Sequence, residues 1–169
     1  MSASPKSKLN DQLPQNFDNY FPLSFKKSNY WIGVASWDHV MRGKDLGIAQ
    51  IGHGKQNGLS KMKQSDLIIY YSPRPTLNSK DPLQVFSAIG QITDNEIYQV
   101  DEGNFKPFRR NVLYFKAQQV HIKPLIEELN FIKNKTRWGY SFRFGLLQIS
   151  SQDFATIAKL MDTKWPNQN

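Results

Sequence analysis

The sequence predicts an α+β domain: a curved or barrel-like sheet of five to six strands in mixed order, with short helices beside it. Apolar segments of strand length, rich in aromatic residues, recur along the chain and are separated by Gly, Pro and Asn. Other segments carry a capping residue followed by helical periodicity. Because the chain has 169 residues, of which 39% are hydrophobic, we expect one domain with a substantial core rather than two small domains.

Residues 1–28 are expected to form a flexible polar tail, because Ser, Pro, Asn and Lys dominate there and no apolar period is sustained. The folded domain is expected over residues 29–163, with a short second tail over residues 164–169. No apolar run approaches the ~20 residues of a membrane helix, and the polar N-terminus has no signal-peptide core. The sequence contains no cysteine, which fits a reducing compartment. We therefore expect a cytoplasmic protein without membrane contacts.

Strands are expected where apolar residues run continuously or alternate with polar ones. Residues 67–73 are the clearest case, since Pro73 and Pro75 stop the apolar run. Alternation should place the odd-numbered residues of this strand on one face of the sheet and the even-numbered residues on the other. The remaining expected strands cover residues 29–36, a brief extended piece within 47–55, a long strand or bulged pair in 82–100, then 107–122 and 142–149.

The first helix is expected to begin after Ser36, a favoured N-cap residue, with Asp38 in its first turn and an end near Gly43. Proline is well tolerated in a first helical turn, so Pro124 is expected to open a second helix over residues 124–132. The other helical segments expected are one turn at residues 59–63 and an amphipathic helix over residues 152–161, capped by Ser150 or Ser151.

The net charge of +8 is unevenly distributed along the chain. Between Glu102 and Glu127 there are five basic residues and no acidic one, and between Glu128 and Asp153 there are four, again with no acidic one. Such stretches of one sign suit a polyanion, because contacts with its phosphates release counterions and so favour binding. Ordinary solvated lysines on a basic protein explain them equally well. Charge therefore gives only weak support for nucleic acid as a partner.

The loop "GHGK", residues 52–55, does not match a nucleotide-binding P-loop, which needs glycines five positions apart followed by Lys and Ser or Thr. We expect a tight turn that presents His53 and Lys55, in which His53 can donate or accept hydrogen bonds at the edge of a heterocycle. The alternative is that the glycines serve only the turn and His53 is solvated. The three histidines show no metal-ligand spacing, and no catalytic arrangement is recognisable. No metal, cofactor or enzymatic activity is therefore expected.

The stretch "RWGYSFRFG", residues 137–145, resembles the first RNP motif of RNA-binding RRM domains, because it combines arginine, glycine and aromatic residues. An RRM is rejected, since too few elements follow the stretch and Trp138 separates the arginine from the glycine. We expect a loop that enters the last strand, with Phe142 and Phe144 in the core and Arg143 on the opposite face. Most other aromatic residues should also be core, but a cavity lined by a few of them would suit a flat ligand such as an extruded base.

Five segments together resemble the EVE domain family of the PUA-like superfamily in order and spacing. They are "YWIGVASWDHV", "GIAQIGHGKQNGLSKMKQSDLIIYYSP", "PLQVFSAIGQI", "IYQVDEGNFKPFRRNV" and "LNFIKNKTRWGYSFRFG". The resemblance extends over about residues 29–162. It implies a PUA-like small β-barrel with short flanking helices, related in fold to the YTH domains. It also implies binding of a modified base in DNA or RNA, flipped out of the strand into an aromatic pocket.

Carried onto this sequence, the resemblance implies a base pocket and a set of phosphate contacts. The implied base-pocket residues are Trp31, Ser36, Gln50, His53, Lys55, Tyr71, Ser72, Phe105, Trp138 and Arg143. The implied phosphate-binding residues are Lys55, Arg109, Arg110 and Arg137. Aromatic faces would stack on the base at about 1–3 kcal/mol each, and polar side chains would hydrogen-bond its edge.

The sequence therefore predicts a non-catalytic domain that reads a modified base in DNA or RNA, acting as a monomer or weak dimer. One alternative is a sensor of a free small molecule or nucleotide, or a protein-interaction module. The other alternative is an enzyme acting on nucleosides or RNA, with His53 and Lys55 as a proton-transfer pair.

Overall fold

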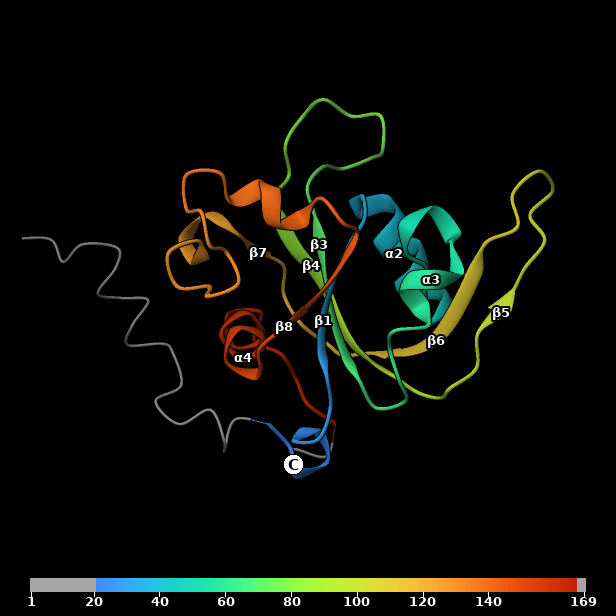
Figure 1. Ribbon diagram of the computed structural model, residues 1–169, viewed down its shortest axis with the longest axis horizontal. Coiled ribbons are helices and arrows are strands. Elements are labelled where there is room, and N and C mark those ends of the chain that lie inside the picture. Colours follow the sequence, from blue (N-terminus) through green and yellow to red (C-terminus); the bar gives the residue numbers. More distant parts are fainter. Residues whose placement is uncertain (1–20, 167–169) are drawn as a thin grey trace, which may run out of the picture.

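Eight strands form one mixed sheet in the computed structural model, which describes residues 21–166 (Figure 1). The strands are β1 (Tyr30–Val34), β2 (Ile48–Ala49), β3 (Leu67–Ser72), β4 (Val85–Ile92), β5 (Tyr98–Gln99), β6 (Phe108–Tyr114), β7 (Val120–His121) and β8 (Leu146–Ile149). Their main order is β2-β6-β4-β3-β1-β8, with β5 beside β6 and β7 beside β4. β1 and β3 are parallel, and the other paired strands are antiparallel.

The prediction of an α+β fold is confirmed, but the sheet is not closed into the expected barrel of five to six strands. Among the described residues, the end strands β2 and β8 pair with β6 and β1, and not with each other. Both end strands are short, because the chain leaves the sheet soon after each of them begins. A glycine turn follows β2, and Ser150 starts a helix directly after β8. Two short edges therefore remain where a barrel would have joined them.

Within residues 21–166, three α-helices accompany the sheet: α2 (Trp37–Leu46), α3 (Gln56–Leu59) and α4 (Ser151–Leu160). Short 3-10 turns form η2 (Leu23–Phe25), η3 (Gly52–Gly54), η4 (Lys123–Leu125) and η5 (Trp138–Phe142). As predicted, Ser36 precedes α2, and Ser150 Oγ caps α4 by accepting from the Asp153 N–H at 3.1 Å. α2 continues past Gly43 and ends before Gly47, whose φ of 67° is typical of a C-terminal glycine. No helix within residues 21–166 is long and apolar enough to cross a lipid bilayer.

The helix expected over residues 124–132 does not form. Only the 3-10 turn η4 and further turns occupy this segment. The N–H groups of Asn130 and Phe131 donate to the buried carboxylate of Asp153 at 2.9 and 2.8 Å. A distant side chain therefore takes the backbone hydrogen bonds that would have continued a helix.

The segment before β8 also differs from its expected extended form. Residues 138–142 coil as η5, and Gly145 has a φ of 73°, so the strand begins only after this glycine. Phe142 is buried, as predicted, but Phe144 is 71% exposed and lies outside the core. The single helical turn expected at residues 59–63 lies earlier, in α3.

The sheet separates two apolar cores. Alternation along β3 directs its odd-numbered residues to one core and its even-numbered apolar residues to the other, as predicted. α4 packs in the first core, and α2 and α3 pack in the second, on the opposite side of β1 (Figure 1). Phe21 and Phe25 are buried in the first core, where both meet Trp165 edge-on. The parts of both expected tails that adjoin the domain are therefore packed; residues 1–20 and 167–169 lie outside the described structure.

Candidate ligand cavity

A cavity of about 290 Å³ opens where four chain segments meet. It is lined by residues from segments 34–39, 50–53, 73–77 and 142–145. Its volume lies at the lower end of the range for small-molecule sites. The cavity therefore has room for one small ring system rather than for an extended cofactor.

Parallel pairing of β1 with β3 brings two of these segments together. Val34 lies beside Tyr71 in the register, so both chains leave the sheet at the same edge. Beyond this edge they stay joined, because the Ala35 N–H donates to the Tyr71 carbonyl at 3.2 Å. The Trp37 N–H likewise donates to the Arg74 carbonyl at 3.0 Å. The carboxyl ends of parallel strands are frequent positions for ligand sites.

A turn in the left-handed region of backbone conformation holds a third segment. Gly52, His53 and Gly54 have φ values of 57°, 59° and 80°. A Cβ atom on Gly54 would lie 2.5 Å from the Cβ of Pro107 and 2.9 Å from its Cα, so only glycine fits there. His53 adopts the same conformation at an energetic cost, and functional sites often carry strain of this kind. The turn places the exposed His53 in the cavity lining.

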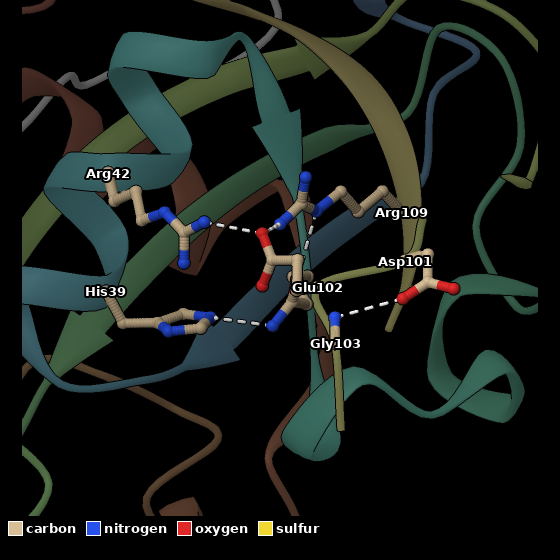
Figure 2. A network of polar contacts seen from close by, with 7 residues as sticks. His39, Arg42, Asp101, Glu102, Gly103 and Arg109 are labelled. Carbon is tan, nitrogen blue, oxygen red and sulfur yellow. Dashed lines mark hydrogen bonds and ion pairs between the residues drawn. The ribbon is translucent and has the colours of Figure 1, made fainter. Parts of the chain in front are cut away.

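A polar network centred on Gln50 lies on the α2 side of the cavity. Gln50 Oε1 accepts from Arg109 Nε at 3.1 Å, and Gln50 Nε2 lies 3.3 Å from His39 Nε2. Figure 2 shows Arg42 and Arg109 approaching Glu102 from opposite sides, and both donate to Glu102 Oε1, at 2.5 and 2.6 Å. Because Arg109 engages the Gln50 amide oxygen, the amide nitrogen must donate to His39. His39 Nε2 is then an acceptor, and the proton of the ring lies on Nδ1.

Burial lowers the pKa of His39 below its usual 6.5. The positive charges of Arg42 and Arg109 lower this pKa further, and the carboxylate of Asp38 opposes them. His39 is therefore neutral at neutral pH. This is the charge state that the hydrogen bond from the neighbouring amide requires.

Folding stability should fall as the pH drops below about 6.5, because the unfolded state then takes up a proton at His39 that the folded state resists. The contribution of His39 to stability is fully present above its pKa in the unfolded state. It is lost as the pH falls toward the lower pKa of His39 in the folded state. His39→Gln removes the titrating group, so it should flatten the stability profile between about pH 7 and pH 5. Urea unfolding across this range would measure the effect, with the exposed His121→Gln as control. A profile unchanged by His39→Gln would contradict this origin of the pH dependence.

Four of the ten residues implied for the base pocket line this cavity: Ser36, Gln50, His53 and Arg143. They come from three different segments of the chain, and the structure brings them together. The Ser36 hydroxyl donates to Asp38 Oδ1 at 2.6 Å, so its oxygen remains free to accept from a ligand.

Three of the other implied residues are buried, each with 7% exposure or less: Trp31 and Tyr71 in the two cores, and Ser72 within the sheet. Trp31 donates its indole N–H to Asp66 Oδ2 at 2.9 Å. Tyr71 stacks on Phe142 with ring centroids 4.1 Å apart, and the Ser72 hydroxyl is hydrogen-bonded within the sheet. These side chains serve the packing and are not part of the cavity lining.

The remaining three implied residues also lie outside the lining. Lys55 is exposed beyond the glycine turn, and Phe105, which is 41% exposed, packs near this turn. Trp138 is half-buried in η5 and meets two core rings edge-on. Since His53 lines the cavity and Lys55 does not, the cavity does not hold them as a pair.

Two of the four residues expected to contact phosphates are buried. Arg109 is 9% exposed and held by the network described above, whereas Arg110 is 2% exposed and donates to three backbone carbonyls. Burial and these hydrogen bonds argue against phosphate contacts from either guanidinium. Lys55 and Arg137 are exposed, and neither side chain has a hydrogen-bond or ion-pair partner within residues 21–166.

Several residues of the lining were not assigned to the cavity from the sequence, among them His39, Arg74, Leu77 and Phe142. His39 follows Ser36 by three positions at the start of a helix, and helical spacing was the signal that could have identified it. Arg74 could not be identified in this way, because its position depends on the parallel pairing of two strands that are far apart in sequence.

The lining of the cavity is basic and contains no carboxylate. Arg74 and Arg143 carry its positive charge, His39 and His53 add ring nitrogens, and no Asp or Glu contributes to it. Within the described part of the chain, no three His, Cys, Asp or Glu side chains are arranged to hold a metal ion. The arrangement suits a ligand that combines a flat polar ring with negative charge nearby.

The chain matches the family model of the EVE domain over residues 29–160. "UPF0310 protein in gntR 5'region" of Bacillus licheniformis is 47% identical over 127 residues, which cover 75% of this chain and 86% of that protein. UPF0310 protein YdcG of Bacillus subtilis is 39% identical over 135 residues, covering 79% and 92%. Among solved structures, protein PSPTO5229 of Pseudomonas syringae is similar with a TM-score of 0.50 and 13% identity, covering 78% of this chain and 99% of that one. This structural likeness concerns the fold alone.

Proposed function

This chain belongs to the EVE domain family, and from that premise we propose that it is a non-catalytic domain that binds nucleic acid and holds one extruded, modified base in the cavity. The observation that carries the proposal is the lining, where basic side chains and a buried aromatic ring converge without a carboxylate. A nucleic acid offers a flat ring and negative phosphates together, which this combination suits. The volume of about 290 Å³ supports a single base as the occupant.

Phe142 supplies the aromatic wall of the cavity. It is 6% exposed, its ring stacks on Tyr71, and Trp138 meets it edge-on with centroids 6.3 Å apart. Because these neighbours hold the ring in place, contact with a base costs little additional conformational entropy. Contact with a rigid, preformed wall favours planar ligands over flexible ones of similar size.

Two histidines supply the polar groups that would distinguish one base edge from another. In the neutral tautomer of His39, Nδ1–H is the only ring donor, and nothing within residues 21–166 accepts from it. A base that presents a carbonyl oxygen or an unprotonated ring nitrogen would satisfy this donor. His53 can donate or accept, and Arg74 adds positive charge to the same lining.

Fluorescence anisotropy with labelled single-stranded oligonucleotides tests the proposal. One position would carry cytosine, adenine, or a methylated or hydroxymethylated form of either, in DNA and in RNA. We expect one modified strand to bind about tenfold more tightly than its unmodified counterpart, which corresponds to one well-formed additional contact. His53→Gly should largely abolish this preference, since glycine removes the imidazole and accepts the left-handed backbone without strain. His121→Ala, which changes an exposed histidine outside the cavity, is the matched control.

Equal affinity of the folded protein for all modified and unmodified strands would contradict base reading. A salt titration distinguishes base reading from the alternative in which the cavity holds a free small molecule. Phosphate contacts make affinity fall steeply with ionic strength, whereas the affinity for an uncharged ligand barely changes. The enzyme alternative has less support, because Lys55 does not line the cavity with His53. Product formation from nucleosides that is lost in His53→Ala would favour it.

A further inference from the structure

An arginine–aromatic cluster, formed by Tyr140, Arg143 and Phe144, lies on the surface. Tyr140 and Phe144 are 65% and 71% exposed. The guanidinium carbon of Arg143 lies 3.5 Å from the ring centroid of Tyr140 and 4.1 Å from that of Phe144. Single exposed apolar residues are normal, but two rings joined by an arginine form a contiguous patch, and such patches mark binding sites.

The cluster is ordered before any ligand binds. Arg143 lies over both rings, and its Nη1 also donates to the Tyr140 carbonyl at 3.0 Å. These contacts restrict the rotamers of a long side chain, so less entropy is lost when it binds a partner. The other N–H groups of this guanidinium have no acceptor within residues 21–166, and they can donate to a phosphate as a planar fork.

An open cleft of about 760 Å³ includes the cluster in its lining. Lys133 and Arg137 add positive charge to this lining. Its one carboxylate, Asp153, is 1% exposed and accepts three hydrogen bonds from residues 130–131. The surface of the cleft is therefore basic, and its charge complements a polyanion.

Arg143 lines both this cleft and the base cavity. We propose that an unpaired strand of nucleic acid runs from the cavity over the arginine–aromatic cluster into the cleft. Bases next to the extruded one stack on Tyr140 and Phe144, and a phosphate between them meets Arg143. This inference rests on the proposed function and adds to it the path of the strand and its single-stranded state.

The exposed rings are the reason for an unpaired strand. Aromatic side chains recognise the faces of bases, and a duplex buries these faces in its own stack. A surface for duplexes would instead present mainly donors to the phosphates of the two backbones. DNA and RNA strands offer the same base faces and phosphates, so both are arms of the test.

Anisotropy titrations of the full-length chain would compare unmodified thymidine and uridine strands of about 12 nucleotides with a duplex of the same length. We expect each lost ring to weaken single-strand binding about fivefold or more. The double variant Tyr140→Ala/Phe144→Ala should therefore bind both single strands at least about 25-fold more weakly than the parent, and should bind the duplex with the affinity of the parent. Phe144→Trp should retain single-strand affinity, because it keeps a ring. Leu113→Ala, which changes a 51% exposed side chain on β6, is the control for loss of apolar surface.

Neither ring lines the cavity, so the double variant should keep the preference for a modified base, whereas His53→Gly should lose it. Unchanged single-strand affinity in the double variant, or an equal loss for the duplex, would overturn the strand path and leave base reading intact. If His53→Gly and the parent show no preference while the double variant still loses single-strand affinity, the strand path stands and base reading fails. A folded protein that binds no strand overturns both.

Discussion

Replacement of Asp66 by alanine is expected to lower the free energy of unfolding by about 3–5 kcal/mol. Asp66 is 3% exposed and accepts four hydrogen bonds. They come from the Trp31 indole and the Lys63 N–H, both at 2.9 Å, and from the Asn29 N–H and side-chain amide at 3.0 and 3.3 Å. Alanine leaves these donors without an acceptor, and an unsatisfied buried donor costs the desolvation energy of that group. The carboxylate joins the start of β1 to the turn before β3, so its loss also loosens two strands that position the cavity.

Urea unfolding followed by circular dichroism would measure this loss. Asp81→Ala, which removes an exposed carboxylate, should change the free energy of unfolding by no more than about 0.5 kcal/mol. In a Trp31→Phe background one of the donors is already gone, so Asp66→Ala should cost less there than in the parent. A loss below about 1 kcal/mol in the parent would show that the four hydrogen bonds do not hold this part of the fold.

Arg110→Met should lower the free energy of unfolding by about 2–4 kcal/mol without changing the salt dependence of nucleic-acid binding. Arg110 donates from Nη1 to the carbonyls of Leu59 and Met62, and from Nη2 to the Asp94 carbonyl at 2.6 Å. Methionine fills a similar volume but leaves the carbonyls of Met62 and Asp94 without a donor, whereas the Leu59 carbonyl still accepts from the Met62 N–H at 3.2 Å. Arg110→Lys should recover only part of the stability, because a single ammonium cannot replace a planar fork whose two nitrogens face different carbonyls.

Arg137→Met is the matched comparison variant for Arg110→Met. Arg137 is exposed, and its side chain has no hydrogen-bond or ion-pair partner within residues 21–166. This substitution should leave stability within about 0.5 kcal/mol of the parent and reduce the slope of log K against log[salt] by about one. Parallel urea and salt titrations of both variants would separate the two roles. If Arg110→Met reduced the salt slope and kept its stability, Arg110 would be a phosphate contact after all.

Elements governed by neighbouring residues were predictable from the sequence. β3 follows from an apolar run that ends at two prolines, and α4 follows from Ser150 at its N-cap and an apolar period. The helix expected over residues 124–132 does not form, although Pro124 and its helix-forming neighbours favoured it. The reason is the carboxylate of Asp153, which lies 22 and 23 positions from the N–H groups that it binds.

The candidate site shows the same division. The glycine turn and its exposed His53 were predictable, because two glycines around a polar residue constrain the chain locally. The burial of Arg109 and Arg110 was not, since arginine is mostly exposed in proteins and both were expected at phosphates. Their partners lie far away: Gln50 is 59 positions from Arg109, and Leu59 is 51 positions from Arg110.

The sequence by itself therefore determined the α+β class, the family, most of the strands, and the turn at Gly52–Gly54. Only the tertiary structure decided that the sheet stays open, that Trp31 and Tyr71 belong to the cores, and which side chains meet in the cavity. It also placed the rings of Tyr140 and Phe144 on the surface. Local patterns act over a few residues, whereas burial and hydrogen bonding depend on groups that meet only when β1, β3 and the segments after them have paired.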